Sequence, residues 1–267
     1  AIHEIINNEL INEEEKIMKL LDTKQGNTKV RKSLKYSNWK GINPDNTDFA
    51  SLSLMPDYKI CGGSKSAGCM DLCLKGSGFA KIFNSVNVAR QTKTNFLLND
   101  KQGFINQLSK ELFNYNKKCI KNNKKGFVRL NTISDYPFYK TGLMEKNNDL
   151  EFIDYTKIAK RLFEQLPSNY HLIFSFSGRA QYENQVRLAL KTNYPISVVF
   201  YDTFPDTFLG RKVIDGDKSD LNNALSFNKI VGLTFKEIDK KTFNEFKDND
   251  FIVYNHQLDY YNKKFLN

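Results

Sequence analysis

Short runs of apolar residues recur along the chain and alternate with longer stretches that have helical periodicity. Residues 79–119 show a helical pattern in two pieces, and shorter helical patterns end near residues 166 and 192. Continuous apolar runs separated by helices are typical of buried parallel strands in a doubly wound sheet or a β/α barrel. The runs that predict strands are residues 49–55, 127–133, 151–155, 171–176, 196–201, 229–234 and 250–254.

This strand pattern favours an α/β fold of the β/α (TIM-type) barrel kind, complete or partial, over a Rossmann fold. The chain contains neither G-x-G-x-x-G nor G-x4-G-K-[ST], so no motif favours a dinucleotide site or a P-loop. A length of 267 residues suits one large α/β domain. We therefore expect a single barrel domain over residues 48–267. Residues 1–47 should form an N-terminal helix, at 5–21, and a basic extension.

The cellular location is predicted from the absence of two patterns. No apolar stretch approaches the roughly 18 residues that a membrane-spanning helix needs, so no membrane partner is expected. The first residues, AIHEIINNELINEEEK, are acidic and lack a signal-peptide pattern. We expect a soluble, intracellular (cytoplasmic) protein in which thiols stay reduced.

The charge balance suggests a polyanionic partner. Lys and Arg number 40 against 30 Asp and Glu, which gives a formal net charge of +10. Such an excess favours binding to DNA or RNA. The alternative is a composition rich in Lys and Asn without such a partner, because the lysines are scattered. The candidate nucleic-acid-binding residues are Lys29, Arg31, Lys35, Arg90 and Lys93.

The cysteine spacing predicts a metal centre. Cys61, Cys69 and Cys73 form a C-x7-C-x3-C pattern in a Gly- and Ser-rich loop just after the first predicted strand. Thiolates are soft ligands that suit a zinc ion or an iron–sulfur cluster. The alternatives are that they are small buried hydrophobes, or form one local disulfide with a spare thiol. The spacing is looser than the C-x2-C pairs of zinc ribbons, so the identity of the metal stays open.

Polar residues at the ends of the predicted strands are the candidate active-site residues, because catalytic groups of β/α barrels lie at the carboxyl ends of strands. Asp135 is the first catalytic candidate, since a carboxylate there can act as base or nucleophile; the alternative is a turn or N-cap aspartate. Asp217 belongs to a predicted acidic loop, residues 202–220, that also holds Asp215 and Asp220. The candidate substrate-binding residues are Asn131, Lys157, Ser175, Arg179 and Asp217.

Several motifs in a fixed order resemble a family of small phage-encoded gene products of unknown function. The resemblance extends over about residues 25–235 and rests on the order of the motifs more than on any one of them. The motifs are KVRKSLK at residues 29–35, LSLMP at 52–56, the cysteine loop, ARQTKT at 89–94, VRLNTISD at 128–135, YTK at 155–157, LIFSFSG at 172–178 and GRKVIDGD at 210–217.

At the level of the barrel, the chain is similar to two enzyme groups. Resemblance to DNA-guanine transglycosylases implies a pair of carboxylates, here Asp135 and Asp202, and a structural zinc ion; those enzymes carry their zinc cysteines late in the chain, whereas here they are early. Resemblance to radical-S-adenosylmethionine enzymes implies that Cys61, Cys69 and Cys73 hold a four-iron, four-sulfur cluster that binds S-adenosylmethionine, although the usual C-x3-C-x2-C spacing is absent.

The sequence thus leads to a specific functional expectation. We predict a nucleic-acid base-modifying enzyme, a glycosyltransferase of the DNA-guanine transglycosylase type, which exchanges guanine for a 7-deazaguanine base flipped into the barrel mouth. The alternatives are a radical-S-adenosylmethionine-like enzyme and a non-enzymatic DNA-binding protein stabilised by a metal.

Overall fold

The fold is described here from a computed structural model of the chain. The described residues are 18–24, 28–70, 84–235, 243–244 and 247–266, and the side chains of residues 28–31 are left out. The predicted helix at residues 5–21 lies largely outside this part, and residues 18–21 within it are not helical. Residues 18–24 instead run beside the sheet, where Asp22 and Ser51 exchange backbone hydrogen bonds of 2.8 and 2.9 Å.

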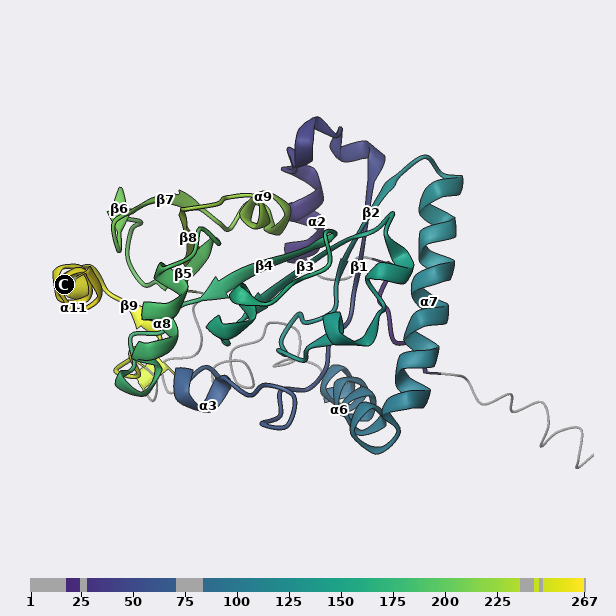
Figure 1. Cartoon of the computed structure of the whole chain (residues 1–267), viewed down its shortest axis with the longest axis horizontal. Helices are drawn as coiled ribbons and strands as arrows, with labels where there is room; N and C mark the ends of the chain where they lie inside the picture. Colours follow the sequence, from purple (N-terminus) through teal and green to yellow (C-terminus); the bar gives the residue numbers. More distant parts are fainter. Residues whose placement is uncertain (1–17, 25–27, 71–83, 236–242, 245–246, 267) are drawn as a thin grey trace, which may run out of the picture.

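A mostly parallel sheet forms the centre of the molecule (Figure 1). Its strand order is β1-β2-β3-β4-β5-β8-β7-β6, with β9 beside β5. All described pairings are parallel except that of β6 with β7. The strands are β1 (Thr47–Ser51), β2 (Lys125–Arg129), β3 (Glu151–Thr156), β4 (Tyr170–Ser175), β5 (Ile196–Phe200), β6 (Thr207–Phe208), β7 (Arg211–Asp215), β8 (Ile230–Thr234) and β9 (Ile252–Val253).

The predicted α/β class is confirmed, but a closed TIM-type barrel is not. The sheet is open, since β1 and β6 lie at opposite ends of the strand order and do not pair within the described residues. The β6–β7 hairpin, which the sequence analysis treated as a loop, extends the sheet beyond β8. The short strand β9 pairs with Val199 and Phe200 of β5, beyond the end of β4, so it does not close the sheet either.

Helices connect the parallel strands. Between β1 and β2 lie α3 (Ser64–Ala67), α6 (Asn84–Asn99) and α7 (Lys101–Lys121). The later connections hold α8 (Glu183–Leu190) and α9 (Asp220–Ala224), and α11 (Leu258–Leu266) lies near the end of the chain. The short 3-10 helices are η1 (Trp39–Gly41), η2 (Pro44–Asn46), η3 (Phe138–Thr141), η4 (Glu145–Asn147), η5 (Ala159–Phe163), η6 (Ala180–Tyr182) and η7 (Asn255–Gln257).

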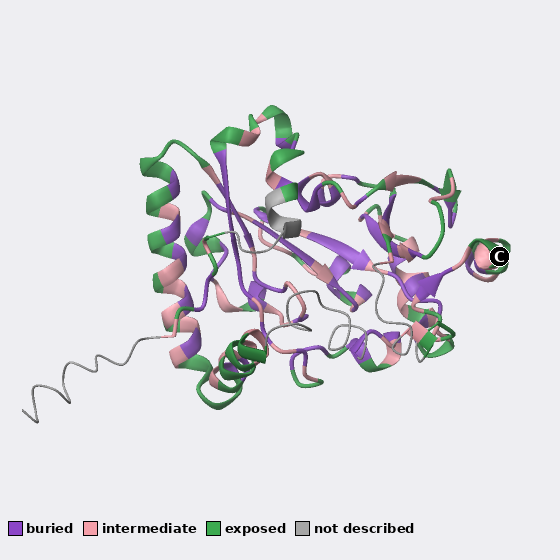
Figure 2. Cartoon of the chain, turned by 180° about the vertical axis from the view of Figure 1, so that it is seen from behind, coloured by how far each residue is buried: buried purple, intermediate pink, exposed green. Residues whose placement is uncertain are grey.

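One face of the sheet packs against the long helices. Because successive side chains of a strand point to opposite faces, Ala50, Val128 and Phe152 share one face. They belong to a large apolar cluster that includes Leu108 of α7 and Val186 of α8. Figure 2 shows the outer side of α7 as exposed and its inner side as buried. Glu111 of α7 also accepts hydrogen bonds from the backbone amides of residues 20 and 21, at 2.8 to 3.1 Å.

The opposite face packs against helix α2 (Thr28–Lys35), η1 and α9. Phe49, Phe127, Ile153 and Ile173 form a second apolar cluster with Trp39, which is fully buried. The ring of Trp39 lies edge-on to those of Phe127 and His171, with distances of 5.1 and 4.9 Å between ring centres. Residues 28–46, part of the predicted basic extension, therefore cover one face of the sheet. Among the described helices, none has the length and apolar character needed to cross a bilayer.

Candidate functional site

A cavity of about 260 Å³ opens at the carboxyl ends of the parallel strands. It lies on the same face as Trp39, because Arg129, Tyr155 and Ser175 come two residues after Phe127, Ile153 and Ile173. Its lining residues are Pro56, Cys61, Ser64, Cys69, Met70, Arg129, Asn131, Thr132, Ile133, Ser134, Asp135, Tyr155, Thr156, Lys157, Ser175, Ser197, Val199, Leu233 and Phe251.

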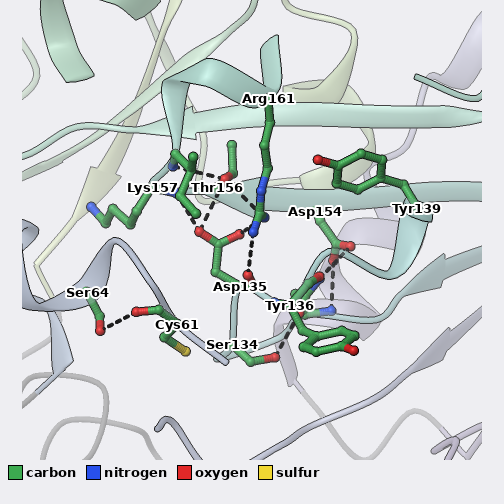
Figure 3. Close-up of polar contacts among 12 residues, drawn as sticks. Cys61, Ser64, Ser134, Asp135, Tyr136, Tyr139, Asp154, Thr156, Lys157 and Arg161 are labelled. Atoms are coloured by element: carbon green, nitrogen blue, oxygen red, sulfur yellow. Dashed lines mark hydrogen bonds and ion pairs between the residues drawn. The ribbon is translucent and has the colours of Figure 1, made fainter. Parts of the chain in front are cut away.

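Asp135 lies in this lining, but both of its carboxylate oxygens are already bonded (Figure 3). Oδ1 forms a buried ion pair with Arg161, and Oδ2 accepts hydrogen bonds from the Lys157 amide at 2.8 Å and from Thr156 Oγ1 at 3.2 Å. Burial raises the pKa of Asp135, and the Arg161 guanidinium opposes that rise. This arrangement suits a carboxylate that joins the loops after β2 and β3.

Asn131 and Asp154 shape the adjacent wall. The amide and the side chain of Asn131 donate to Asp154 at 2.8 and 3.0 Å, and Asn131 Oδ1 accepts from Ser134 and from the amide of Tyr136. Asp154 is buried, and its burial raises its pKa to about 6. The polar atoms of Asn131 are thus used to fix the loop after β2.

Lys157 brings a buried amine to the cavity. Its Nζ donates to the carbonyl oxygens of Ser175 and Phe176, at 3.1 and 2.9 Å, and lies 4.4 Å from the ring centre of Phe251. The carbonyl of Ser175 also accepts from Tyr182 at 3.0 Å. Lys157 and Ser175, predicted as substrate-binding residues, therefore meet at neighbouring strand ends.

Two of the three predicted metal-binding cysteines lie in the cavity wall. Cys61 and Cys69 are buried and are not joined in a disulfide. The loop that carries them is fixed over the strand ends, because Ser177 Oγ donates to the carbonyl of Ala67 at 2.8 Å. Burial raises the pKa of the Cys61 thiol to about 11. Cys73 lies outside the described residues, within which no group of three or more His, Cys, Asp or Glu side chains could hold a metal ion.

Comparison with models of protein families identifies a family for this chain. The family model described as Gene product 88 matches residues 18–247. The chain belongs to the Gene product 88 family. No curated protein and no solved structure shows significant similarity to it. The predicted resemblance to a phage gene-product family is confirmed at that level, while the similarity to transglycosylases stays a prediction.

The span matched by the Gene product 88 model contains every lining residue of the cavity except Phe251. The lining includes Tyr155, which lies at the end of a predicted strand, and Arg129, whose contribution the sequence analysis missed. Arg129 ends β2, and its guanidinium lies 4.6 Å from the ring centre of Tyr155. The sequence did hold a signal for Arg129. It comes two positions after the apolar Phe127 in the same strand, so both side chains must lie on one face of the sheet.

Three of the predicted catalytic and substrate-binding residues lie outside the cavity lining. Asp202 is exposed and accepts a hydrogen bond from the amide of Asn255 at 3.1 Å. Asp217 accepts one from the amide of Thr234 at 2.9 Å, which links the loop after β7 to β8. Arg179 packs beside Gly68, where a Cβ atom would collide with its guanidinium. The structure does not bring them together with Asp135.

The predicted nucleic-acid-binding residues lie on different elements. Lys29 and Arg31 belong to α2, but their side chains are outside the described part of the chain. Lys35 of α2 is exposed. Arg90 and Lys93 lie on α6 and are partly buried, and Lys93 Nζ donates to the carbonyl of Leu20 at 2.8 Å. Burial lowers the pKa of Lys93.

Proposed function

We propose that this protein is a radical-S-adenosylmethionine-like enzyme whose active site is the cavity at the strand ends. The observation that carries the proposal is the position of Cys61 and Cys69. Both lie in the loop that follows β1, and both line the cavity into which β2, β3, β4 and β5 direct polar side chains. A cysteine loop after the first strand of a parallel sheet is the arrangement that this enzyme group uses.

The donor set fits an iron–sulfur cluster. Cys61 and Cys69 supply soft sulfur ligands from the cavity wall, and Cys73 follows four residues after Cys69 in the sequence. These three cysteines would hold the cluster, whose fourth iron would bind S-adenosylmethionine. When bound, the cluster supplies an electron that cleaves S-adenosylmethionine reductively.

Other residues of the cavity would bind the reactants and exclude water. Met70, Val199, Leu233 and Phe251 give the lining its apolar part, which shields reactive species from solvent. Lys157 contributes a positive charge held by carbonyl groups. The cavity therefore combines apolar walls with a few fixed polar groups, as small-molecule sites do.

The transglycosylase hypothesis finds less support in this geometry. That chemistry needs two carboxylates near the same base, whereas Asp135 is the one carboxylate among the described lining residues and is bonded to Arg161. Asp202 lies outside the lining. The transglycosylase, its zinc ion and its 7-deazaguanine substrate stay predictions, which the experiment below separates from the cluster.

The test is the metal content of protein purified without oxygen. We expect brown protein with iron and sulfide, and cleavage of S-adenosylmethionine under reducing conditions. Cys61→Ser, Cys69→Ser and Cys73→Ser should each lose most of the iron, because a cluster bound by three thiolates loses a ligand. Cys119→Ser is the matched control, since Cys119 is buried in α7 and is not part of the cavity lining; it should keep its iron.

Two outcomes contradict the proposal. Colourless protein that binds zinc, or no metal under any condition of purification, removes the cluster. Incorporation of labelled guanine or a labelled 7-deazaguanine into DNA by such protein supports the transglycosylase in its place. A protein that binds DNA and catalyses neither reaction supports the non-enzymatic alternative.

A further inference from the structure

Arg129 presents a guanidinium group to the cavity from the end of β2. Its side chain is 12% exposed, and its contacts hold it in one position. Nη1 forms an ion pair with Asp220 Oδ2 at 2.8 Å, and Nη2 donates to the carbonyl of Thr132 at 3.2 Å. The Cζ atom of the guanidinium lies over the ring of Tyr155, 4.6 Å from its centre.

The partners of Arg129 are themselves fixed by the layer that covers this face of the sheet. Tyr155 donates to Asp220 Oδ1 at 2.8 Å and accepts from Asn223 at 3.2 Å. The amide of Asp220 donates to Ser33 Oγ of α2 at 2.9 Å. Helices α2 and α9 therefore orient the carboxylate that orients Arg129. Such support is what a binding group needs to keep its geometry before a ligand arrives.

Among the three nitrogens of the Arg129 guanidinium group, Nε is left without an acceptor. Its Nε is buried and makes no hydrogen bond within the described part of the chain. A buried donor without a partner is costly, and a ligand oxygen in the cavity would remove that cost. Nη1 and Nη2 each donate to one acceptor, whereas Nε donates to none within the described residues, so we assign the Nε edge of the guanidinium to the ligand.

A second positive group lies in the same lining. Lys157 reaches the cavity from the loop after β3, the strand that pairs with β2. The only carboxylate in the described lining, Asp135, is paired with Arg161. The charged residues of the described lining other than Asp135 are thus Arg129 and Lys157, and Arg and Lys donors bind carboxylate and phosphate oxygens most strongly.

We propose that Arg129 holds an anionic oxygen group, a carboxylate or a phosphate, of the molecule that binds in this cavity. This inference rests on the proposed function in taking the cavity as the active site, and it adds the chemical class of the substrate. The inference does not depend on the iron–sulfur cluster, because all the contacts that support it are formed between residues of the protein.

Inorganic phosphate and acetate are the probes, one for each source of the anionic group, with sodium chloride at equal ionic strength as the reference. We expect at least one probe to raise the melting temperature of the wild-type protein in a saturable way. Arg129→Gln and Arg129→Lys should weaken the apparent affinity about tenfold or more, because the lysine keeps the charge but loses the planar fork. Lys121→Gln, which removes a charge from the exposed end of α7, should bind as the wild type does.

A spectroscopic measurement on the wild-type protein covers the case in which the Arg129 variants do not fold. The ¹⁵Nε resonance of Arg129 should shift on saturation with the probe that binds. The inference is wrong if neither probe stabilises the protein, or if binding occurs without a shift of that resonance and is unchanged in Arg129→Lys. If the protein contains iron but binds neither probe, the inference is wrong and the proposed function is unaffected. If the protein contains no iron but Arg129 binds a probe, the proposed function is wrong and the inference about Arg129 is supported.

Discussion

Asp154 is a buried carboxyl group whose ionisation should affect the stability of the protein. Burial raises its pKa from 3.8 to about 6, while the hydrogen bonds from Asn131 and the charge of Arg129 oppose the rise and Asp135 adds to it. A raised pKa in the folded state means that the protonated form folds more favourably. The contribution of Asp154 is therefore complete at low pH and is lost as the pH rises through about 6.

Asp154→Asn tests this prediction, because asparagine does not ionise. Between about pH 4 and about pH 7, the unfolding free energy of the wild type should fall relative to that of the variant by up to roughly 3 kcal/mol. Urea unfolding across this range measures the difference. Asp149→Asn, a substitution of an exposed carboxylate, serves as the control. Parallel pH profiles for the wild type and Asp154→Asn would show that Asp154 does not titrate in this range.

The rule that polar residues follow the strands predicted part of the cavity lining. Asn131, Asp135, Lys157 and Ser175 all line it, because parallel strands end at one edge of the sheet. The rule could not tell which of these side chains are bonded internally, since the partner of Asp135 is Arg161, in a segment predicted only as a helix. Arg129 was missed because it lies inside the run predicted as a strand, whereas the rule considers only the residues at strand ends.

At the scale of secondary structure, the apolar runs predicted the central strands of the sheet. They did not predict the β6–β7 hairpin at its edge. Each of the predicted runs overlaps one of β1, β2, β3, β4, β5, β8 and β9. The β6–β7 hairpin was missed because β6 has two residues and β7 includes Arg211, which donates to three carbonyls at the end of α8. Barrel closure depends on which strands pair at the edges, and the local pattern of apolar residues holds no information about that.

The layer formed by α2, η1 and α9 should depend on Trp39. Trp39→Ala should lower the free energy of unfolding by about 3 to 5 kcal/mol, because it leaves a cavity against Phe127 and His171. Trp39→Phe should cost much less, since it keeps an aromatic ring and removes an indole N–H that has no hydrogen-bond partner among the described residues.

Urea unfolding followed by circular dichroism measures both variants. Trp39 is the only tryptophan, so its fluorescence in the wild type reports on this layer directly. If the fluorescence changes at a lower urea concentration than the circular dichroism, the layer unfolds separately from the sheet. Equal stability of Trp39→Ala and the wild type would show that the layer contributes little to the fold.

At the scale of the whole molecule, the formal charge of +10 leads to a prediction about DNA. Binding to single-stranded or duplex DNA should weaken steeply with added salt, because Lys and Arg contacts release condensed counterions. Lys35 is exposed on α2, so Lys35→Gln should weaken binding and reduce the slope of log affinity against log salt by about 1. Lys93 was also predicted to bind DNA, but its amine is partly buried and bonded to the Leu20 carbonyl, so Lys93→Gln is the matched control and should leave the slope unchanged. Fluorescence anisotropy with a labelled oligonucleotide measures both slopes, and binding that ignores salt would exclude this charge-driven mode of DNA recognition.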